Sequence, residues 1–442
     1  MAIHIGERGF TGGLKNFGVL RKRSINILAR GSDNVMGNMP VKTWHLLLAP
    51  VLMALASCGG VRLPSPLAFT APCKTLREKE PDLSHSNIYF MAVDMPDCRG
   101  KSLQYHGYRY AEPSYGRAGH TPDQTESEDT IAYQQERKPF WVPEDRSMRD
   151  VRPDGYPRKL LVFIHGYNNS FDAVAKRAWA LSKIQMGDVP LVFIRWPSRS
   201  SLWTYTYDED SISWAQDHIN QTIYDLTKPC NPDGTECSDV TLISHSMGAR
   251  ALVGAVRYLE RTSPERARRI RKVVLASPDY DRATALQEGG PIRELLAHDR
   301  EVLVYTSRED VAVRTSRRLH GFARLGSSGC KYDVDYAKQQ LPEGSWCHLV
   351  PVNLGLGRSE RGTNAPPPRR LSVVETSTVS KGFLGHGDFL DACPVLVDLG
   401  YFLDGRDSGL RETVTRQLPG QPEEIGYVID REKAQRLPQC RK

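Results

Sequence analysis

The stretch Val240-Thr-Leu-Ile-Ser-His-Ser-Met-Gly-Ala-Arg-Ala-Leu-Val253 decides how the rest of the chain is interpreted. Residues 240–243 form a short, mainly apolar run, which is typical of a buried strand in a parallel sheet. Residues 248–261 have the length and pattern of a helix, and the small residues before them predict a tight turn. The stretch therefore predicts a strand, a turn and a helix, the unit from which α/β folds are built.

Similar apolar runs on both sides of this unit predict further strands. They cover residues 88–93, 160–164, 191–194, 272–276, 302–305 and 371–375, and residues 104–110 are a candidate partner for the first of them. Stretches of helical length lie between the runs, at residues 171–185, 210–226 and 248–261, with Asp210 or Ser211 as a possible cap of the second. This alternation indicates an α/β fold, a mainly parallel sheet with helices on both faces.

The turn Ser244-His-Ser-Met-Gly248 is the strongest candidate for a catalytic feature. It resembles the nucleophile elbow Gly-x-Ser-x-Gly of α/β-hydrolases, with Ser244 in the first glycine position. Such an elbow holds the central serine in a strained conformation, so the residues two positions away must be small. Ser244 and Gly248 meet that demand, and Ser246 is the predicted nucleophile. The helix that follows points its N-terminus at the developing oxyanion.

A second turn, Ile164-His-Gly-Tyr-Asn-Asn169, follows the run 160–164. In α/β-hydrolases a His-Gly turn at this point supplies a backbone N–H to the oxyanion hole, and Gly166 lets the chain approach closely. The backbone N–H groups of Tyr167 and Met247 are the predicted donors. His165 is expected to be a structural residue of this turn and not a base.

The acid and the base of a triad should follow the serine in that order. Asp310 lies on a loop after the run 302–305 and is the preferred acid, with Asp279 and Asp281 as competitors after the preceding run. His386, flanked by glycines, is the predicted base, and it is preferred to His348, which stands beside a cysteine in a surface loop.

Several motifs together resemble the α/β-hydrolase family catalogued as domain of unknown function 900. They are Phe163-Ile-His-Gly-Tyr-Asn-Asn169, Arg195-Trp-Pro-Ser198, Tyr207-Asp-Glu-Asp-Ser211, the elbow, Ala276-Ser-Pro-Asp279, Ser307-Arg-Glu-Asp310 and His386. The likeness covers roughly residues 87–395, apart from the polar insertion at 112–158, and implies the α/β-hydrolase fold and a Ser246–Asp310–His386 triad. It implies no substrate. The chain departs from the family in an expanded region with cysteines at 312–370.

The N-terminal part predicts export. The apolar run 44–57 is too short to span a bilayer, which takes about 20 residues, and follows Lys42 as a signal-peptide core would. Its end, Leu55-Ala-Ser-Cys58, resembles the lipobox of bacterial lipoproteins, which implies cleavage before Cys58 and lipid on its thiol. Because Gly59 and not Asp follows, lipoprotein sorting favours the outer membrane, facing the periplasm. Met36 or Met39 would give a signal peptide of ordinary length.

The predicted organisation is therefore linear. Residues 1–57 are the signal peptide and 58–86 a lipidated, Pro-rich tether. The hydrolase domain covers 87–401, with a polar insertion at 112–158 and a loop-rich one at 312–370, and 402–442 form a C-terminal tail. Eight cysteines remain after Cys58, which suggests disulfides in an exported protein, with Cys230–Cys237 and Cys330–Cys347 as candidate pairs across surface loops.

Charge and spacing narrow the function. Residues 1–57 supply +5 of the net charge of +7, so the nearly balanced remainder predicts no nucleic-acid partner. No Cys-x-x-Cys spacing suggests a metal, and no cofactor is expected. The favoured function is hydrolysis of a small-molecule or lipid carboxylic ester at the membrane to which the chain is anchored. The alternatives are a non-catalytic envelope lipoprotein that uses the fold as a binding scaffold, and an amide or peptide hydrolase. The oligomeric state is not predicted.

Overall fold

The computed structural model describes the greater part of the chain after residue 64. The described residues are 65, 68–69, 73, 80–100, 103–120, 131–139, 159–184, 189–199, 204–228, 239–287, 289–327, 371–380, 386–417 and 422–440. They all belong to the second of two units, Ser65–Lys442, so the predicted signal peptide and Cys58 lie outside them. Among the described helices none is long and apolar enough to cross a membrane.

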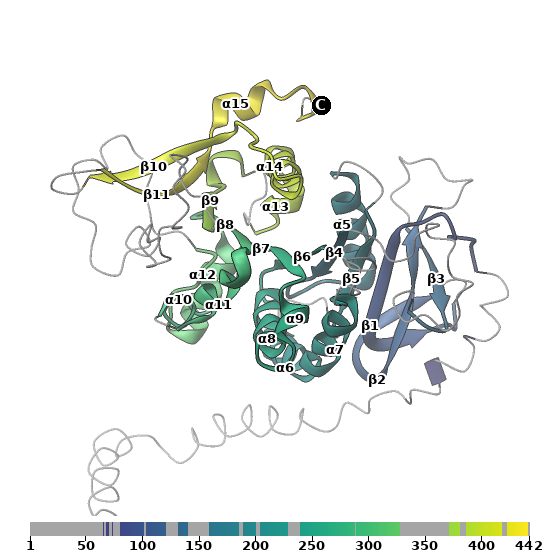
Figure 1. Cartoon of the computed structure of the whole chain (residues 1–442). Coiled ribbons are helices and arrows are strands. Elements are labelled where there is room, and N and C mark those ends of the chain that lie inside the picture. The colour runs from purple at the N-terminus through teal and green to yellow at the C-terminus, as the bar shows by residue number, and fades with distance from the viewer. Residues whose placement is uncertain are drawn as a thin grey trace, which may run out of the picture. The chain divides into compact units, whose positions relative to one another are not determined.

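In this part of the chain eleven strands form one sheet in the order β10-β11-β9-β8-β7-β6-β4-β5-β1-β2-β3 (Figure 1). The central strands from β1 to β9 in this order, and β11 beside β9, are parallel, while β2, β3 and β10 pair antiparallel at the two ends. The strands are β1 (Ile88–Asp97), β2 (Gln104–Gly119), β3 (Ala132–Glu136), β4 (Lys159–Ile164), β5 (Leu191–Arg195), β6 (Asp239–His245), β7 (Ile270–Ala276), β8 (Glu301–Thr306), β9 (Leu371–Glu375), β10 (Arg411–Gln417) and β11 (Pro422–Ile429).

Helices cover both faces of the sheet, which confirms the predicted fold class (Figure 1). One face packs against residues such as Ile219 and Leu252, and the other against residues such as Val174 and Leu399, all fully buried. The helices are α5 (Phe171–Lys183), α6 (Tyr205–Trp214), α7 (Gln216–Leu226), α8 (Gly248–Thr262), α9 (Pro264–Ala267), α10 (Arg282–Leu286), α11 (Pro291–Leu295), α12 (Val311–His320), α13 (Asp388–Asp391), α14 (Cys393–Leu403) and α15 (Arg431–Arg436). Each fully buried Leu or Val side chain contributes about 1.5–3 kcal/mol to folding.

The expected single helix 210–226 is instead two helices, and the first begins earlier, at Tyr205. Neither Asp210 nor Ser211 caps it, because the residue before α6 is Thr204. The buried side of α6 is partly polar, since Asp208 and Ser211 accept hydrogen bonds from neighbouring segments. A search for periodic apolar residues therefore does not detect the first turn of α6.

Three expected boundaries also differ from the structure. The polar insertion expected from residue 112 begins as strand, because β2 continues to Gly119 and pairs with β3. The region 312–370 begins as the helix α12, and residues 328–370 lie outside the described part. The expected C-terminal tail contributes β10 and β11, which extend the sheet beyond β9. β2 and β3 are polar and largely half-exposed, and β10 is polar in sequence, so these strands lack the apolar runs that mark the central strands.

A buried carboxylate fastens the C-terminal hairpin to the domain. Asp398 on α14 is fully buried and accepts hydrogen bonds from Tyr305 on β8 at 2.7 Å and from Ser408 at 2.6 Å. Both its oxygens also bind the Arg411 guanidinium, at 2.8 and 2.9 Å. Because every oxygen of the buried carboxylate is engaged, loss of either partner would leave an uncompensated charge, so this pair ties the start of β10 to the domain.

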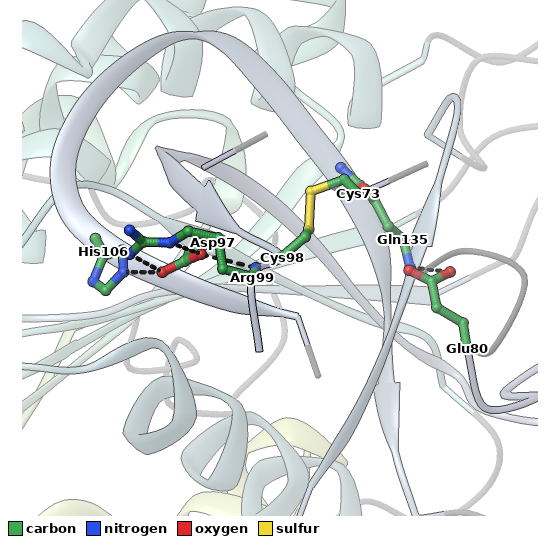
Figure 2. The surroundings of a disulfide bond; sticks show 7 residues. All are labelled: Cys73, Glu80, Asp97, Cys98, Arg99, His106 and Gln135. Atoms are coloured by element: carbon green, nitrogen blue, oxygen red, sulfur yellow. Dashed lines mark hydrogen bonds and ion pairs between the residues drawn. A yellow bond between two sulfur atoms is a disulfide. The ribbon is translucent and has the colours of Figure 1, made fainter. Parts of the chain in front are cut away.

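Two disulfides are present among the described residues, Cys73–Cys98 and Cys393–Cys440. Figure 2 shows the first, which joins the segment before β1 to the end of that strand, and beside it Asp97 accepts hydrogen bonds from Arg99 and His106. The segment expected to be a tether is therefore fastened to the domain at residue 73. The candidate pairs Cys230–Cys237 and Cys330–Cys347 lie outside the described residues.

Candidate active site

The turn between β6 and α8 has the strained backbone that the elbow motif predicts. Ser246 has a φ of +51°, a left-handed conformation that non-glycine residues rarely adopt. Its N–H donates to Ala276 O at 2.9 Å, and its carbonyl accepts from Asp279 N–H at 3.0 Å. Gly248 is required at the end of the turn, because a Cβ there would lie 2.5 Å from His165 O. The strain is thus held by hydrogen bonds and packing from two neighbouring strand ends.

The turn after β4 lies directly against the elbow. A Cβ added to Gly166 would stand 2.7 Å from Ser246 Cβ and 2.9 Å from His245 Nδ1. Only glycine allows the two turns to approach so closely. The backbone N–H of Tyr167, the next residue, therefore belongs to a turn that packs against the serine. Met247 is the N-cap residue of α8, and the first N–H groups of a helix have no intrahelical acceptor. The two predicted oxyanion donors come from these facing turns.

His165 is engaged on both ring nitrogens. Its Nδ1–H donates to Gly166 O at 2.7 Å, and its Nε2 accepts from Arg195 Nη1 at 3.0 Å and from Trp196 N–H at 3.2 Å. The ring also stacks on Trp196, with centroids 4.7 Å apart. Burial, followed by the charge of Arg195, holds the pKa of His165 well below its usual range. The imidazole is neutral and shapes the turn.

Two buried carboxylates support the same turn from behind. Asp208 Oδ2 accepts from Asn168 N–H at 3.2 Å and from the Ser198 hydroxyl at 2.6 Å. Ser198 Oγ in turn accepts from Asn169 N–H at 3.1 Å. On β1 the fully buried Asp94 lies 3.0 Å from Arg195 Nε, the arginine that contacts His165. The acidic stretch at the start of α6 thus fixes the position of the candidate oxyanion turn.

The structure brings His386 and Asp310 together. His386 Nδ1–H donates to Asp310 Oδ2 at 2.8 Å, and the other oxygen of Asp310 caps α12 by accepting Val313 N–H at 2.9 Å. Burial by itself lowers the pKa of His386, but the charge and hydrogen bond of Asp310 outweigh it, so the pKa is raised above its ordinary value. His386 Nε2 is buried and has no hydrogen-bond partner among the described residues.

The two competing carboxylates have other partners. Both oxygens of Asp279 are taken: Tyr205 OH donates at 2.5 Å, Ser316 Oγ at 2.6 Å, and the guanidinium groups of Arg250 and Arg324 each lie at 3.2 Å. Burial alone would raise the pKa of Asp279, but these groups lower it below its ordinary value.

Asp281 is the N-cap of α10, where its side chain accepts Thr284 N–H at 2.7 Å. Of the three carboxylates that the sequence offered, Asp310 is the one that contacts His386. His348 lies outside the described residues.

Sequence reasoning missed a polar cluster around Asp279 and the role of His245. Glu209 on α6 pairs with Arg250 on α8 and with His320 on α12, where the distance is 3.1 Å. His245 Nε2 lies 2.8 Å from His386 O. Glu209 lies just before the expected helix 210–226, and no periodicity marks residues that converge from four different elements.

Comparison with known proteins agrees with this architecture. A family model described as "Alpha/beta hydrolase of unknown function (DUF900)" matches residues 149–354. The match and the mainly parallel sheet covered by helices show that the chain has the α/β-hydrolase fold. No curated protein has significant sequence similarity to the chain.

Solved structures with similarity to the chain include three hydrolases. They are an esterase from Pyrobaculum calidifontis (13% identity, 38% of this chain and 62% of that one, TM-score 0.22), a lipase/esterase from Lactobacillus plantarum (11%, 48% and 83%, 0.25) and a dienelactone hydrolase from Anabaena variabilis (17%, 37% and 68%, 0.24). The present chain thus covers about three fifths of the length of the Pyrobaculum esterase. At these identities and TM-scores the likenesses carry no conclusion about activity.

Proposed function

We propose that this chain is a serine hydrolase that cleaves carboxylic esters, with Ser246 as nucleophile, His386 as base and Asp310 as the acid that orients it. The observation that carries the proposal is the 2.8 Å hydrogen bond between His386 Nδ1 and Asp310, which leaves the buried Nε2 without a partner. A neutral imidazole held in this tautomer presents its Nε2 lone pair, which is what a general base needs. Ser246 stands in the strained turn after β6, and in the sheet only β7 separates β6 from β8, the strand that leads to Asp310.

In the proposed reaction Ser246 Oγ attacks the ester carbonyl carbon while His386 Nε2 takes the hydroxyl proton. The carbonyl oxygen becomes an oxyanion, which the N–H groups of Tyr167 and Met247 stabilise by hydrogen bonds. The intermediate collapses, the C–O bond to the alcohol breaks, and His386 returns the proton to the leaving alkoxide. Water then attacks the acyl-serine with His386 again as base, which releases the acid and restores Ser246.

Each oxyanion donor in such sites contributes about 2.7–4 kcal/mol to transition-state stability. That contribution requires donors held in place before the substrate arrives. The supports beneath residues 166–169, which are the neutral His165, the pair Arg195–Asp94 and the carboxylate of Asp208, provide that rigidity.

Labelling with a fluorophosphonate probe tests the nucleophile. We expect wild-type protein to be labelled and to hydrolyse p-nitrophenyl acetate, and Ser246→Ala to lose both, with turnover lower by about 10³-fold or more. Ser182→Ala, which removes a hydroxyl on α5 that donates to Trp179 O, is the matched control and should be labelled normally. Full activity in Ser246→Ala would refute the proposal. Faster cleavage of the matching p-nitroanilide would assign the site to amide hydrolysis.

We also propose that the mature chain is a lipoprotein anchored through Cys58 in the outer membrane and facing the periplasm, where its substrate is a small-molecule or lipid ester. The lipobox-like sequence Leu55-Ala-Ser-Cys58 supports this. The disulfides Cys73–Cys98 and Cys393–Cys440 are in keeping with an oxidising compartment. The protein should incorporate labelled palmitate and sediment with outer membranes, and Cys58→Ser should abolish both. Unchanged membrane recovery of Cys58→Ser would refute the anchor.

A further inference from the structure

The histidine that precedes the candidate nucleophile lies where the elbow, the turn at residues 164–169 and the loop at residues 386–387 that carries the proposed base (the base loop) meet. His245 is the last residue of β6 and is almost fully buried. Its Nε2 lies 2.8 Å from the backbone carbonyl of His386, its ring centroid is 4.6 Å from that of His386, and the ring stacks on Phe389 at 5.0 Å. Its Nδ1 faces Gly166, where an added Cβ would approach it to 2.9 Å. One side chain thus contacts the elbow, the oxyanion turn and the base loop.

The contacts fix the protonation state of His245. A carbonyl can only accept, so Nε2 carries the hydrogen and donates it to His386 O. Burial, followed by the neighbouring His386, lowers the pKa of His245 well below its usual range, so the ring stays neutral. Nδ1 is then an acceptor, and it is buried without a hydrogen-bond partner among the described residues.

This arrangement is costly for the fold. A buried acceptor without a partner costs about 1–3 kcal/mol, and an apolar ring of similar shape would avoid that cost. A purely structural role is therefore poorly served by histidine at this position. The group that histidine supplies, and phenylalanine lacks, is the N–H donor aimed at the backbone of His386.

We infer that His245 is a positioning residue, whose Nε2–H holds the His386 backbone so that the imidazole stays paired with Asp310 and in place for the proposed proton transfer from Ser246. This inference rests on the proposed triad and adds a residue to it. The base loop is 141 residues away in sequence from His245, so the hydrogen bond ties the base to the strand that carries the nucleophile. Without it the His386 loop can move away from both partners.

The pKa of His386 should respond to the loss of the His245 donor. The groups that act on its pKa besides burial are Asp310 and Asp279, which raise it, and Arg177, which lowers it. Substituting neutral His245 by a neutral residue alters none of these charges. A lower pKa of His386 would therefore report a longer distance to Asp310, because the only other change that a displaced loop brings, greater exposure of the imidazole, would raise the pKa.

The test compares His245→Phe and His245→Gln with Phe389→Leu. His245→Phe keeps a ring against Phe389 but has no donor, and we expect kcat for p-nitrophenyl acetate to fall by about 10- to 100-fold, as for a displacement approaching 1 Å, with thermal melting close to wild type. The acid limb of the kcat/KM profile should move to lower pH. His245→Gln offers an amide N–H and should recover part of the lost kcat and part of the shift of the acid limb. Phe389→Leu removes the ring that stacks on His245 but leaves the Nε2–H donor in place, so it should keep the wild-type acid limb.

A second measurement needs no turnover. The low-field proton resonance of the His386 Nδ1–H bonded to Asp310 can be followed by NMR in a Ser246→Ala background. We expect His245→Phe to weaken or shift this resonance and to lower its titration midpoint. Absence of ester hydrolysis in the wild type would refute the proposed function while leaving this measurement valid. An unchanged resonance, or losses of kcat that merely follow losses of thermal stability, would overturn the role of His245.

Discussion

Replacing Gly166 by alanine tests the packing on which the candidate oxyanion hole depends. The new Cβ would stand 2.7 Å from Ser246 Cβ and 2.9 Å from His245 O. Non-bonded carbon atoms prefer separations of about 3.5 Å or more, so the two turns must move apart by about 0.8 Å. The displaced element carries Tyr167 N–H, one of the two proposed donors. A displacement of this size in a catalytic site costs about 10²-fold in rate, within the range found for loss of one oxyanion donor.

The assay is steady-state hydrolysis of p-nitrophenyl acetate, with thermal and urea unfolding measured on the same samples. We expect kcat of Gly166→Ala to fall by about 10²-fold, and the free energy of unfolding to fall by about 1–3 kcal/mol, as for other overpacked sites. Gly400→Ala is the matched control: Gly400 lies on α14, outside the site, and its added Cβ would stand 2.8 Å from the carbonyl oxygen of Ile184 at the end of α5. It should lose similar stability and keep its kcat. A kcat of Gly166→Ala within threefold of wild type, or an equal loss in Gly400→Ala, would refute the reasoning.

Three further predictions concern charged groups. Asp310→Asn should lower kcat by about 10²–10⁴-fold with little loss of stability, since asparagine also caps helices. Asp279→Asn should instead lower the free energy of unfolding by about 3–5 kcal/mol, because it removes the carboxylate that pairs with the buried Arg324 and also with Arg250, which keeps Glu209. The opposite pattern in activity assays and urea melts would make Asp279 the acid. The pairing with Asp310 raises the pKa of His386 above its ordinary value of 6.5, and the imidazole stops acting as a base when the pH falls through this pKa. The acid limb of kcat/KM should therefore lie above pH 6.5. A limb below pH 6.5 would contradict the pairing. Asp398→Ala should lower the free energy of urea unfolding by about 3–5 kcal/mol, because it leaves Arg411 without its buried partner. The acid limb of kcat/KM should stay unchanged. Unaltered stability would show that this carboxylate does not hold the C-terminal hairpin.

Local sequence was sufficient for the central architecture. The strands from β4 to β9 each begin and end within two residues of an apolar run, because a strand covered on both faces must be apolar along its whole length. The outer elements were not predictable in this way. β2 beyond Tyr110, β3 and the hairpin β10–β11 pair at the ends of the sheet, where one face or edge remains exposed and polar residues are tolerated. The first turn of α6 was missed because its buried Asp208 is polar and hydrogen-bonded.

The candidate site also has a part that could be predicted from local sequence and a part that could not. The elbow could be read from Ser244-His-Ser-Met-Gly248 because its strain is local: a φ of +51° at Ser246 demands small neighbours, and these are visible in five consecutive residues. The order of strands likewise limited the acid to a few carboxylates at strand ends. What only the tertiary structure decided is which of them contacts the base, since His386 and Asp310 are 76 residues apart, and that His245 contacts the base loop. Such pairings depend on how loops from different strands converge. The distances between their side chains are set by the packing of the whole domain and not by any local stretch of sequence.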